Sequence, residues 1–172
     1  MYFTKIAVIL SLAASALAAP TASPMQKRAL TQKKYADFQI SDGTAGNALA
    51  EAQAAFPIDT SDLAGVSASD LAIIQAARET AEAAETDAFN TEIKAASGDA
   101  ATALQNGKIK NKVLKLFLET TALQIQQAQG ADNQDKIDQE QTKLNNNIAT
   151  DKKAAGQTSQ GVTFTGDVKP DN

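Results

Sequence analysis

The sequence predicts an all-α fold, a single bundle of four to five helices with an extended C-terminal tail. Alanine, glutamine, glutamate, lysine and leucine dominate the chain after residue 28, and these residues favour helix. Runs of β-branched and aromatic residues, which are typical of strands, hardly appear before residue 156. Glycine or proline separates successive segments of about 22 to 30 residues, as in helix bundles.

The first 28 residues have the features of a secretory leader. Lys5 gives a positive start, residues 6–18 are uncharged and mostly apolar, and Ala16-Leu17-Ala18 fits the small-x-small pattern that signal peptidase accepts. The apolar stretch is shorter than the roughly 20 residues that span a bilayer, so we expect no stable membrane anchor. Residues 1–18 are therefore predicted to be a signal peptide cleaved after Ala18, and the protein is expected to be secreted.

Lys27-Arg28 is a dibasic pair of the kind that kexin-type proteases cleave in secreted proteins. Residues 19–28 are therefore predicted to be a propeptide, with Ala29 as the mature N-terminus. Removal of the leader takes away three basic residues and no acidic one, which changes the formal net charge from −4 to −7. A surface this acidic repels phosphate backbones, so we expect no nucleic-acid partner.

Residue types that are absent limit the chemistry. The chain has no cysteine and no histidine, which excludes Ser–His and Cys–His nucleophilic catalysis and the Glu-x-x-His di-iron sites of helix bundles. Acid–base catalysis by two carboxylates stays open, but tryptophan, which often forms sugar-binding platforms, is also absent. We therefore expect no catalytic, cofactor-binding or metal-binding residues.

The predicted bundle domain covers residues 29–155. Its first helix begins near Thr31 and resumes after a turn at residues 41–43 to end at Pro57; whether these are one kinked helix or two stays open. The next helix, residues 68–97, starts with a Ser67/Asp70 capping box. It carries a narrow apolar stripe, which implies close helix packing: Leu71, Ile74, Ala77, Ala81, Ala84 and Ala88.

A short turn ending at Asn106-Gly107 is predicted before the most hydrophobic helix, residues 108–129. Apolar residues cover more than one of its faces, so we expect it at the centre of the bundle. A last helix with a thin apolar stripe follows at residues 132–155. Residues 156–172 are predicted to be a flexible tail, with a short strand over 162–165 as the alternative.

Charged patterns along the helices have two interpretations each. The run Lys108, Lys110, Lys112 and Lys115 suits either a membrane-touching amphipathic helix or lysines that rim a buried helix, and the net negative charge favours the second. Glu79, Glu82 and Glu85 suit either a carboxylate metal site or a solvated helix face, and we favour the solvated face.

Large apolar residues cluster on the helix of residues 108–129 and at Tyr35, Phe38 and Phe56. If an apolar pocket exists, it should lie between Tyr35, Phe38 and Phe56 on one side and Val113, Leu116 and Phe117 on the other. Bundles of this size need their apolar volume for stability, so the core is expected to be mostly filled.

The order of signal peptide, Lys27-Arg28 and the segment ALTQKKYADFQISDGTAGNALAEA resembles uncharacterised small secreted proteins of filamentous fungi. The similarity covers most of residues 28–130 and is densest over 29–56. It implies a cysteine-free helical protein exported from a fungal cell, and it brings no catalytic residues. A looser similarity in size and alanine-rich helices is to fungal hydrophobic-surface-binding proteins and cell-wall mannoproteins, which have lipid-binding helical domains.

Together these observations favour a secreted, non-enzymatic interaction protein that acts at the fungal surface, in association with the cell wall, or on a host. Its partner would be another protein or a surface. The alternative is a carrier that binds a lipid, another apolar small molecule or a hydrophobic surface through the bundle core.

Overall fold

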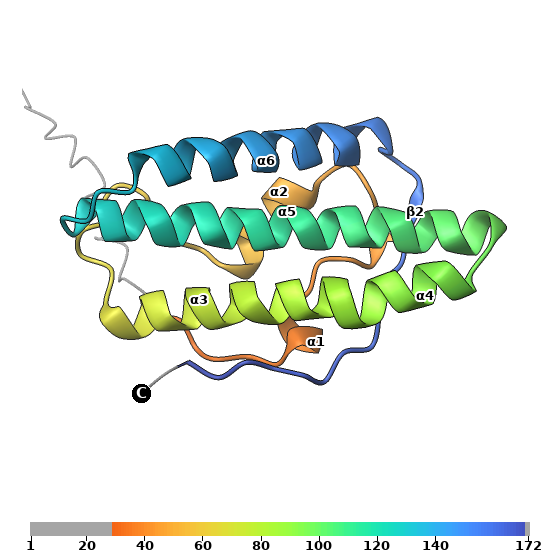
Figure 1. The fold of residues 1–172 in the computed structure, drawn as a ribbon, viewed down its shortest axis with the longest axis horizontal. Helices are drawn as coiled ribbons and strands as arrows, with labels where there is room; N and C mark the ends of the chain where they lie inside the picture. Colours follow the sequence, from red (N-terminus) through yellow and green to blue (C-terminus); the bar gives the residue numbers. More distant parts are fainter. Residues whose placement is uncertain (1–28, 171–172) are drawn as a thin grey trace, which may run out of the picture.

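The computed structural model describes residues 29–170, and within them the predicted all-α bundle is confirmed (Figure 1). Three long segments run up, down and up, so that each is antiparallel to the next (Figure 1). The first consists of α3 (Ala68–Ala83), a π-helical turn η1 (Ala84–Phe89) and α4 (Asn90–Ala95); α5 (Gly98–Ala128) and α6 (Gln134–Lys153) follow. Two short helices, α1 (Tyr35–Phe38) and α2 (Ala48–Ala55), precede them. The predicted processing residues Ala18, Lys27 and Arg28 lie outside the described residues.

Helix α5 is the centre of the bundle, as its apolar pattern predicts. It packs against α3, α6 and α2 (Figure 1). Val113, Leu114, Leu118 and Ile125 are fully buried, because neighbours cover α5 on several faces. The core therefore forms around α5.

Helix α5 also begins earlier than the sequence predicts. The predicted break at Asn106-Gly107 does not exist, since one helix runs from Gly98 to Ala128. Gly107 serves a different purpose: a Cβ there would lie 1.9 Å from the carbonyl oxygen of Gln160. Asn106 Nδ2 donates to the carbonyl of Thr158 at 2.9 Å in the same contact. Both residues thus dock the chain that follows α6 rather than ending a helix.

The π-helical turn η1 changes which face of the 68–95 segment is buried. The predicted stripe continues from Ala84 to Ala88, but Phe89 is the fully buried residue and Ala88 is only half-buried. A π turn adds one residue to the helical repeat, which moves the inward position from four residues on to five. The wider turn thus places a large aromatic side chain in the core beside α5.

The N-terminal segment is less helical than predicted. Thr31 does not start a helix, because residues 29–34 are non-helical and only Tyr35–Phe38 forms a short helix. A two-residue strand β1 (Gly43–Thr44) separates α1 from α2, so the two predicted halves are distinct helices. β1 pairs antiparallel with β2 (Thr158–Ser159), which joins the start of the domain to its end.

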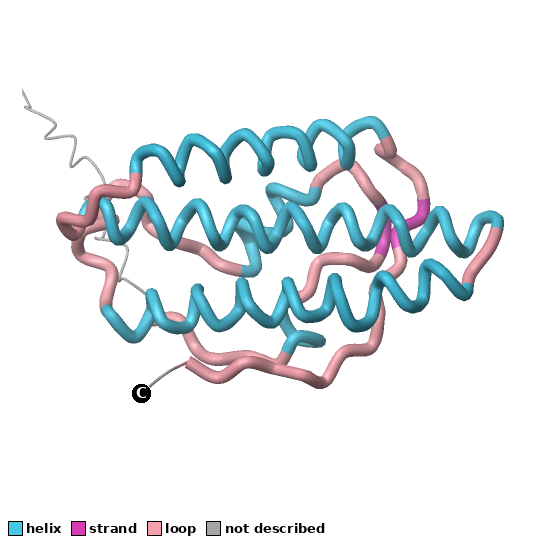
Figure 2. Tube along the Cα trace, in the orientation of Figure 1, coloured by secondary structure: helices cyan, strands magenta, loops and turns pink. Residues whose placement is uncertain are grey.

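The C-terminal tail is extended, as predicted, but it is not free of the body. After β2 it runs back along α1 and α3, where Figure 2 draws it as a long loop. The Gly161 amide donates to Asp42 Oδ1 at 2.8 Å, and the Val168 amide donates to Thr80 Oγ1 at 2.9 Å. The prediction of a flexible tail misses these contacts, and the alternative strand over 162–165 is not formed.

Candidate functional site

The residues of the predicted apolar pocket meet in the core. Tyr35, Phe38 and Phe56 form a chain of edge-to-face aromatic contacts, with ring centroids 5.5 Å apart in each pair. Val113 and Leu116 are buried in the same hydrophobic cluster, and the half-buried Phe117 packs against it. The sequence therefore identifies a true spatial cluster.

This cluster is packed rather than hollow. The hollow that Phe38 and Phe56 border, together with Ile73 and Ala77 of α3, measures about 10 Å³. That is about the space of one water molecule. Phe38 and Phe56 therefore stabilise the fold, and the hollow beside them has no room for a lipid chain.

A polar pair anchors the aromatic cluster to α5. The Tyr35 hydroxyl donates to Asn111 Oδ1 at 2.8 Å, and Asn111 Nδ2 donates to the carbonyl of Ala81 at 2.8 Å. Asn111 is fully buried, so both bonds are shielded from water. Asn111 is not singled out by the sequence pattern. Its polar side chain on the most hydrophobic helix could have indicated a buried hydrogen-bonding role.

Burial changes the acidity of Tyr35. It raises the pKa of the phenol to about 12. Two smaller effects accompany burial: a hydrogen bond with Ser41 lowers the pKa, and the charge of Asp42 raises it. The ordinary value is about 10. The unfolded chain thus loses this proton above pH 10 while the folded chain keeps it, so Tyr35 lowers stability as the pH rises from 10 to 12.

We expect Tyr35→Phe to flatten this part of the pH dependence. Relative to pH 9, the wild-type chain should lose about 2–3 kcal/mol more than the variant by pH 12. Tyr35 is the only tyrosine after residue 28, so absorbance at 295 nm reads its titration directly in a chain that begins at Ala29. A midpoint near 10 in the folded chain would contradict the burial of the phenol.

The lysine run of α5 is neither a membrane-facing surface nor a simple rim. Lys110 is fully buried, and its Nζ lies 2.7 Å from Glu51 Oε2 and donates to the carbonyls of Asp42 at 2.8 Å and Thr44 at 3.2 Å. Lys108 Nζ donates to Asn90 Oδ1 at 2.6 Å. These lysines therefore bind α5 to the segments around it.

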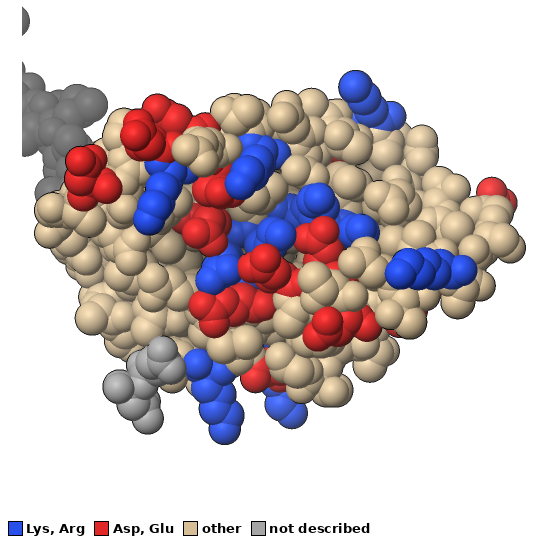
Figure 3. Space-filling view, in the orientation of Figure 1, with Lys and Arg blue, Asp and Glu red and all other residues tan. Residues whose placement is uncertain are grey.

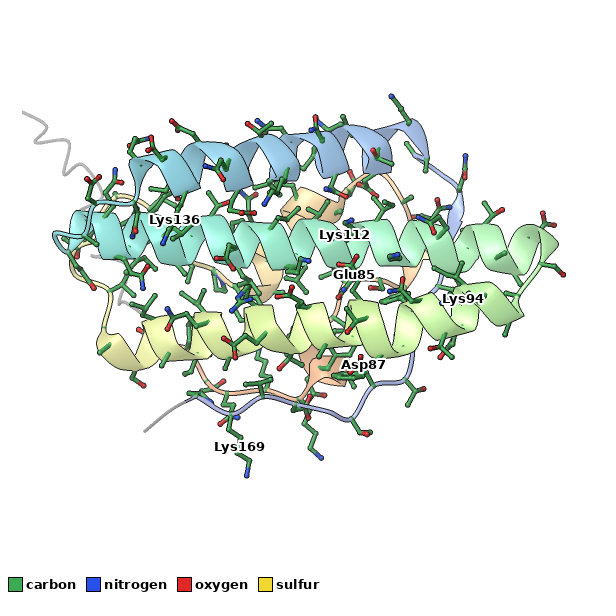
Figure 4. All side chains as sticks on the ribbon, in the orientation of Figure 1. Glu85, Asp87, Lys94, Lys112, Lys136 and Lys169 are labelled. Carbon is green, nitrogen blue, oxygen red and sulfur yellow. The ribbon has the colours of Figure 1, made fainter. Side chains whose placement is uncertain are left out.

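The acidic residues of the 68–95 segment are paired with bases. Glu79 and Glu82 are about half-exposed and both contact Arg78, as expected for a solvated face. Glu85 departs from that expectation, since its side chain is mostly buried against Lys112 at 3.6 Å and Lys115 at 3.1 Å. Figure 4 shows Glu85 and Lys112 next to each other between η1 and α5.

Charge is mixed rather than segregated on the face drawn in Figure 3, where acidic and basic side chains alternate over the helices. Among residues 29–170, no group of three or more His, Cys, Asp or Glu side chains is placed to hold a metal ion. In the same range, no helix combines the length and the apolar content needed to cross a bilayer.

Larger hollows border the C-terminal tail. One of about 670 Å³ lies between residues 34–42 and the tail, and its lining includes Lys34, Ala36 and Phe164. A second of about 250 Å³ lies between α3, α5 and the end of the tail at residues 168–170. The open space of the described molecule thus gathers beside the tail rather than at the predicted pocket.

These features define the chain as a cysteine-free helical bundle with a packed core and grooves beside a docked C-terminal tail. The chain belongs to the family described as "Domain of unknown function (DUF8454)", which matches residues 30–163. The match continues eight residues past the predicted end of the bundle at residue 155 and so includes β2. No curated protein and no solved structure matches the chain.

Proposed function

We propose that this chain is a secreted, non-enzymatic interaction protein that acts at the surface of a fungal cell or on a host. One observation carries the proposal: the domain begins directly after the dibasic pair. The Leu30 amide donates to Asp70 Oδ1 at 2.8 Å, which ties the chain to the start of α3, and the family match also begins at residue 30. Lys27-Arg28 thus lies just before the folded domain, as a propeptide junction should.

The fold also gives a reason for selective processing. Two further dibasic pairs lie within the domain, Lys33-Lys34 and Lys152-Lys153. The side chains of both pairs are exposed, but their backbone is anchored. The Lys34 carbonyl accepts the Asp37 amide at 2.9 Å and the next amide, that of Tyr35, donates to Asp167, while Lys152-Lys153 lies in the last turn of α6. Proteases act preferentially on exposed, unanchored chain, so folding protects both pairs.

We expect the secreted protein to begin at Ala29 with both inner pairs intact. Intact-mass spectrometry and N-terminal sequencing of the culture supernatant measure this directly. Replacing Lys27 and Arg28 with glutamine should leave a chain that begins at Ala19. A wild-type chain that begins at Ala19 or at Tyr35 would contradict the proposed junction.

Surface binding tests the interaction function itself. The chain has no cysteine, so Gln139→Cys on the exposed face of α6 gives a single labelling position. The labelled chain should bind fungal or host cell surfaces saturably and be displaced by excess unlabelled chain. Binding that does not saturate, or retention of the protein inside the producing cell, would reject the proposal.

A carrier of a lipid or another apolar small molecule is the second candidate. The hollow of about 670 Å³ favours it, because small-molecule sites commonly measure about 300–1,000 Å³. Phe164 and Val162 give that hollow some apolar wall, but Lys34, Asp42 and Asp167 also line it. Low-micromolar binding of a fluorescent fatty acid, lost in a folded Phe164→Glu variant, would favour the carrier.

A further inference from the structure

The C-terminal tail is seated on the body in the manner of a bound peptide. Asp167 Oδ1 accepts the Tyr35 amide at 2.8 Å, and the Val168 amide donates to Thr80 Oγ1 at 2.9 Å. Phe164 stacks edge-to-face on Tyr35, with ring centroids 5.7 Å apart. An aromatic ring, a carboxylate and a backbone amide thus meet a matching surface, the tail seat, formed by Tyr35 and Thr80.

The tail seat is built independently of the tail. The Tyr35 ring is fixed by Asn111 and Phe38, and the Thr80 hydroxyl is oriented because it donates to the carbonyl of Ala76 at 2.9 Å. Thr80 is 1% exposed and belongs to a long helix. The groups that hold the tail would therefore stay in place if the tail left.

The tail itself is loosely packed. Beyond Ser159, none of its described residues is buried. The hollow of about 670 Å³ separates part of it from residues 34–42, and Val168 borders two further hollows. The family match ends at residue 163, before Phe164, Asp167 and Val168. The seat thus lies within the family domain, whereas the residues that fill it lie beyond the match.

We propose that the tail seat is a docking surface for an extended peptide of a partner protein, and that residues 161–170 occupy it in the free protein as a displaceable strap. The partner segment would carry an aromatic residue, a carboxylate three residues later and an apolar residue next to it. This pattern copies Phe164, Asp167 and Val168. The inference deepens the proposed interaction function and rests on it for the existence of a partner.

Tethering explains why the strap would be an effective competitor. A segment joined to the body by a short linker is present at an effective concentration of about millimolar. A separate peptide at micromolar concentration would therefore be excluded from the wild-type chain. Weakening the strap should uncover binding without any change to the seat.

The test compares full mature chains that begin at Ala29. In the loosened variant, Phe164→Ala and Asp167→Ala are combined; in the matched control, the exposed Thr163 and Thr165 become alanine. The probe is a fluorescein-labelled peptide with the sequence of residues 160–170. We expect the loosened variant to bind it at least about tenfold more tightly than the wild-type chain or the control does.

A second peptide, which carries the same two alanines in place of Phe164 and Asp167, should bind no variant. Equal binding of both peptides, or no binding to a loosened variant with an unchanged helical spectrum, would overturn the proposal. Light scattering distinguishes a second occupant: a wild-type chain that exchanges tails to form a dimer would assign the seat to a second copy instead.

Hydrogen exchange in the wild-type chain tests the strap even if the loosened variant fails to fold. The Tyr35 and Val168 amides should exchange at least about tenfold faster than that of Leu114 in the centre of α5, because strap opening is local. Equal protection of all three amides would mean that the tail leaves only on global unfolding. Peptide binding is measured on purified protein, so this inference can fail while secretion and surface binding stand.

Discussion

Lys110→Met should lower the free energy of unfolding by about 3 kcal/mol. Methionine fills a similar volume but cannot donate to the carbonyls of Asp42 and Thr44, and it leaves Glu51 without its partner. Each buried acceptor that loses its donor costs about 1–3 kcal/mol, and breaking a buried ion pair costs about 3–5 kcal/mol. Glu51 is partly exposed and can be rehydrated, which keeps the estimate at the lower end.

Lys112→Met is the matched control on the same helix. The Lys112 side chain is one-third exposed, and its Nζ lies 3.6 Å from Glu85 Oε1, so its loss should cost less than about 1 kcal/mol. Urea denaturation followed by helical circular dichroism measures both variants. Equal effects of the two substitutions would mean that water reaches the Lys110 site and that its bonds to Asp42 and Thr44 add nothing to stability.

The bundle was predictable because helical periodicity and composition act locally. Composition, together with the glycine and proline residues between segments, predicted the three long helices. The wide apolar surface over residues 108–129 correctly indicated a central helix. The aromatic cluster of Tyr35, Phe38 and Phe56 was also predictable, because these are large apolar residues of the N-terminal segment and the central helix offers a wide apolar surface for them to cover. These features depend on residues close together in sequence or on volume alone.

Long-range backbone contacts were not predictable from local pattern. Glycine commonly ends helices, but Gly107 lies inside α5. Its missing side chain leaves space for the carbonyl of Gln160, which is 53 residues away in the sequence. Likewise, no local pattern indicates that Phe89 rather than Ala88 faces inward, since the π turn η1 interrupts the regular helical spacing where it packs against α5. The tail seat has the same origin, because Tyr35 and Asp167 meet across 132 residues.

Asp151 is a third long-range contact, and its removal should also be costly. Its two carboxylate oxygens accept the amides of Gly46 and Ala48, each at 2.9 Å, and so cap the start of α2. The nominal N-cap residue, Asn47, makes no capping bond with its own side chain. Asp151 is 2% exposed and Ala48 is 1% exposed, so water cannot readily replace the carboxylate.

Asp151→Ala should therefore lower the free energy of unfolding by about 2–4 kcal/mol, the cost of two orphaned amides and one lost cap. Asp151→Asn keeps one acceptor oxygen and should lose about half as much. Asp138→Ala, on the exposed face of α6, is the control and should cost less than about 0.5 kcal/mol. Hydrogen exchange locates the effect: the Ala48 amide should lose protection in Asp151→Ala, whereas the amide of Leu114 should follow only the global loss. An unchanged rate at Ala48 would show that the cap carries no free energy and that α2 is held by its contacts with α5, among them the Lys110–Glu51 pair.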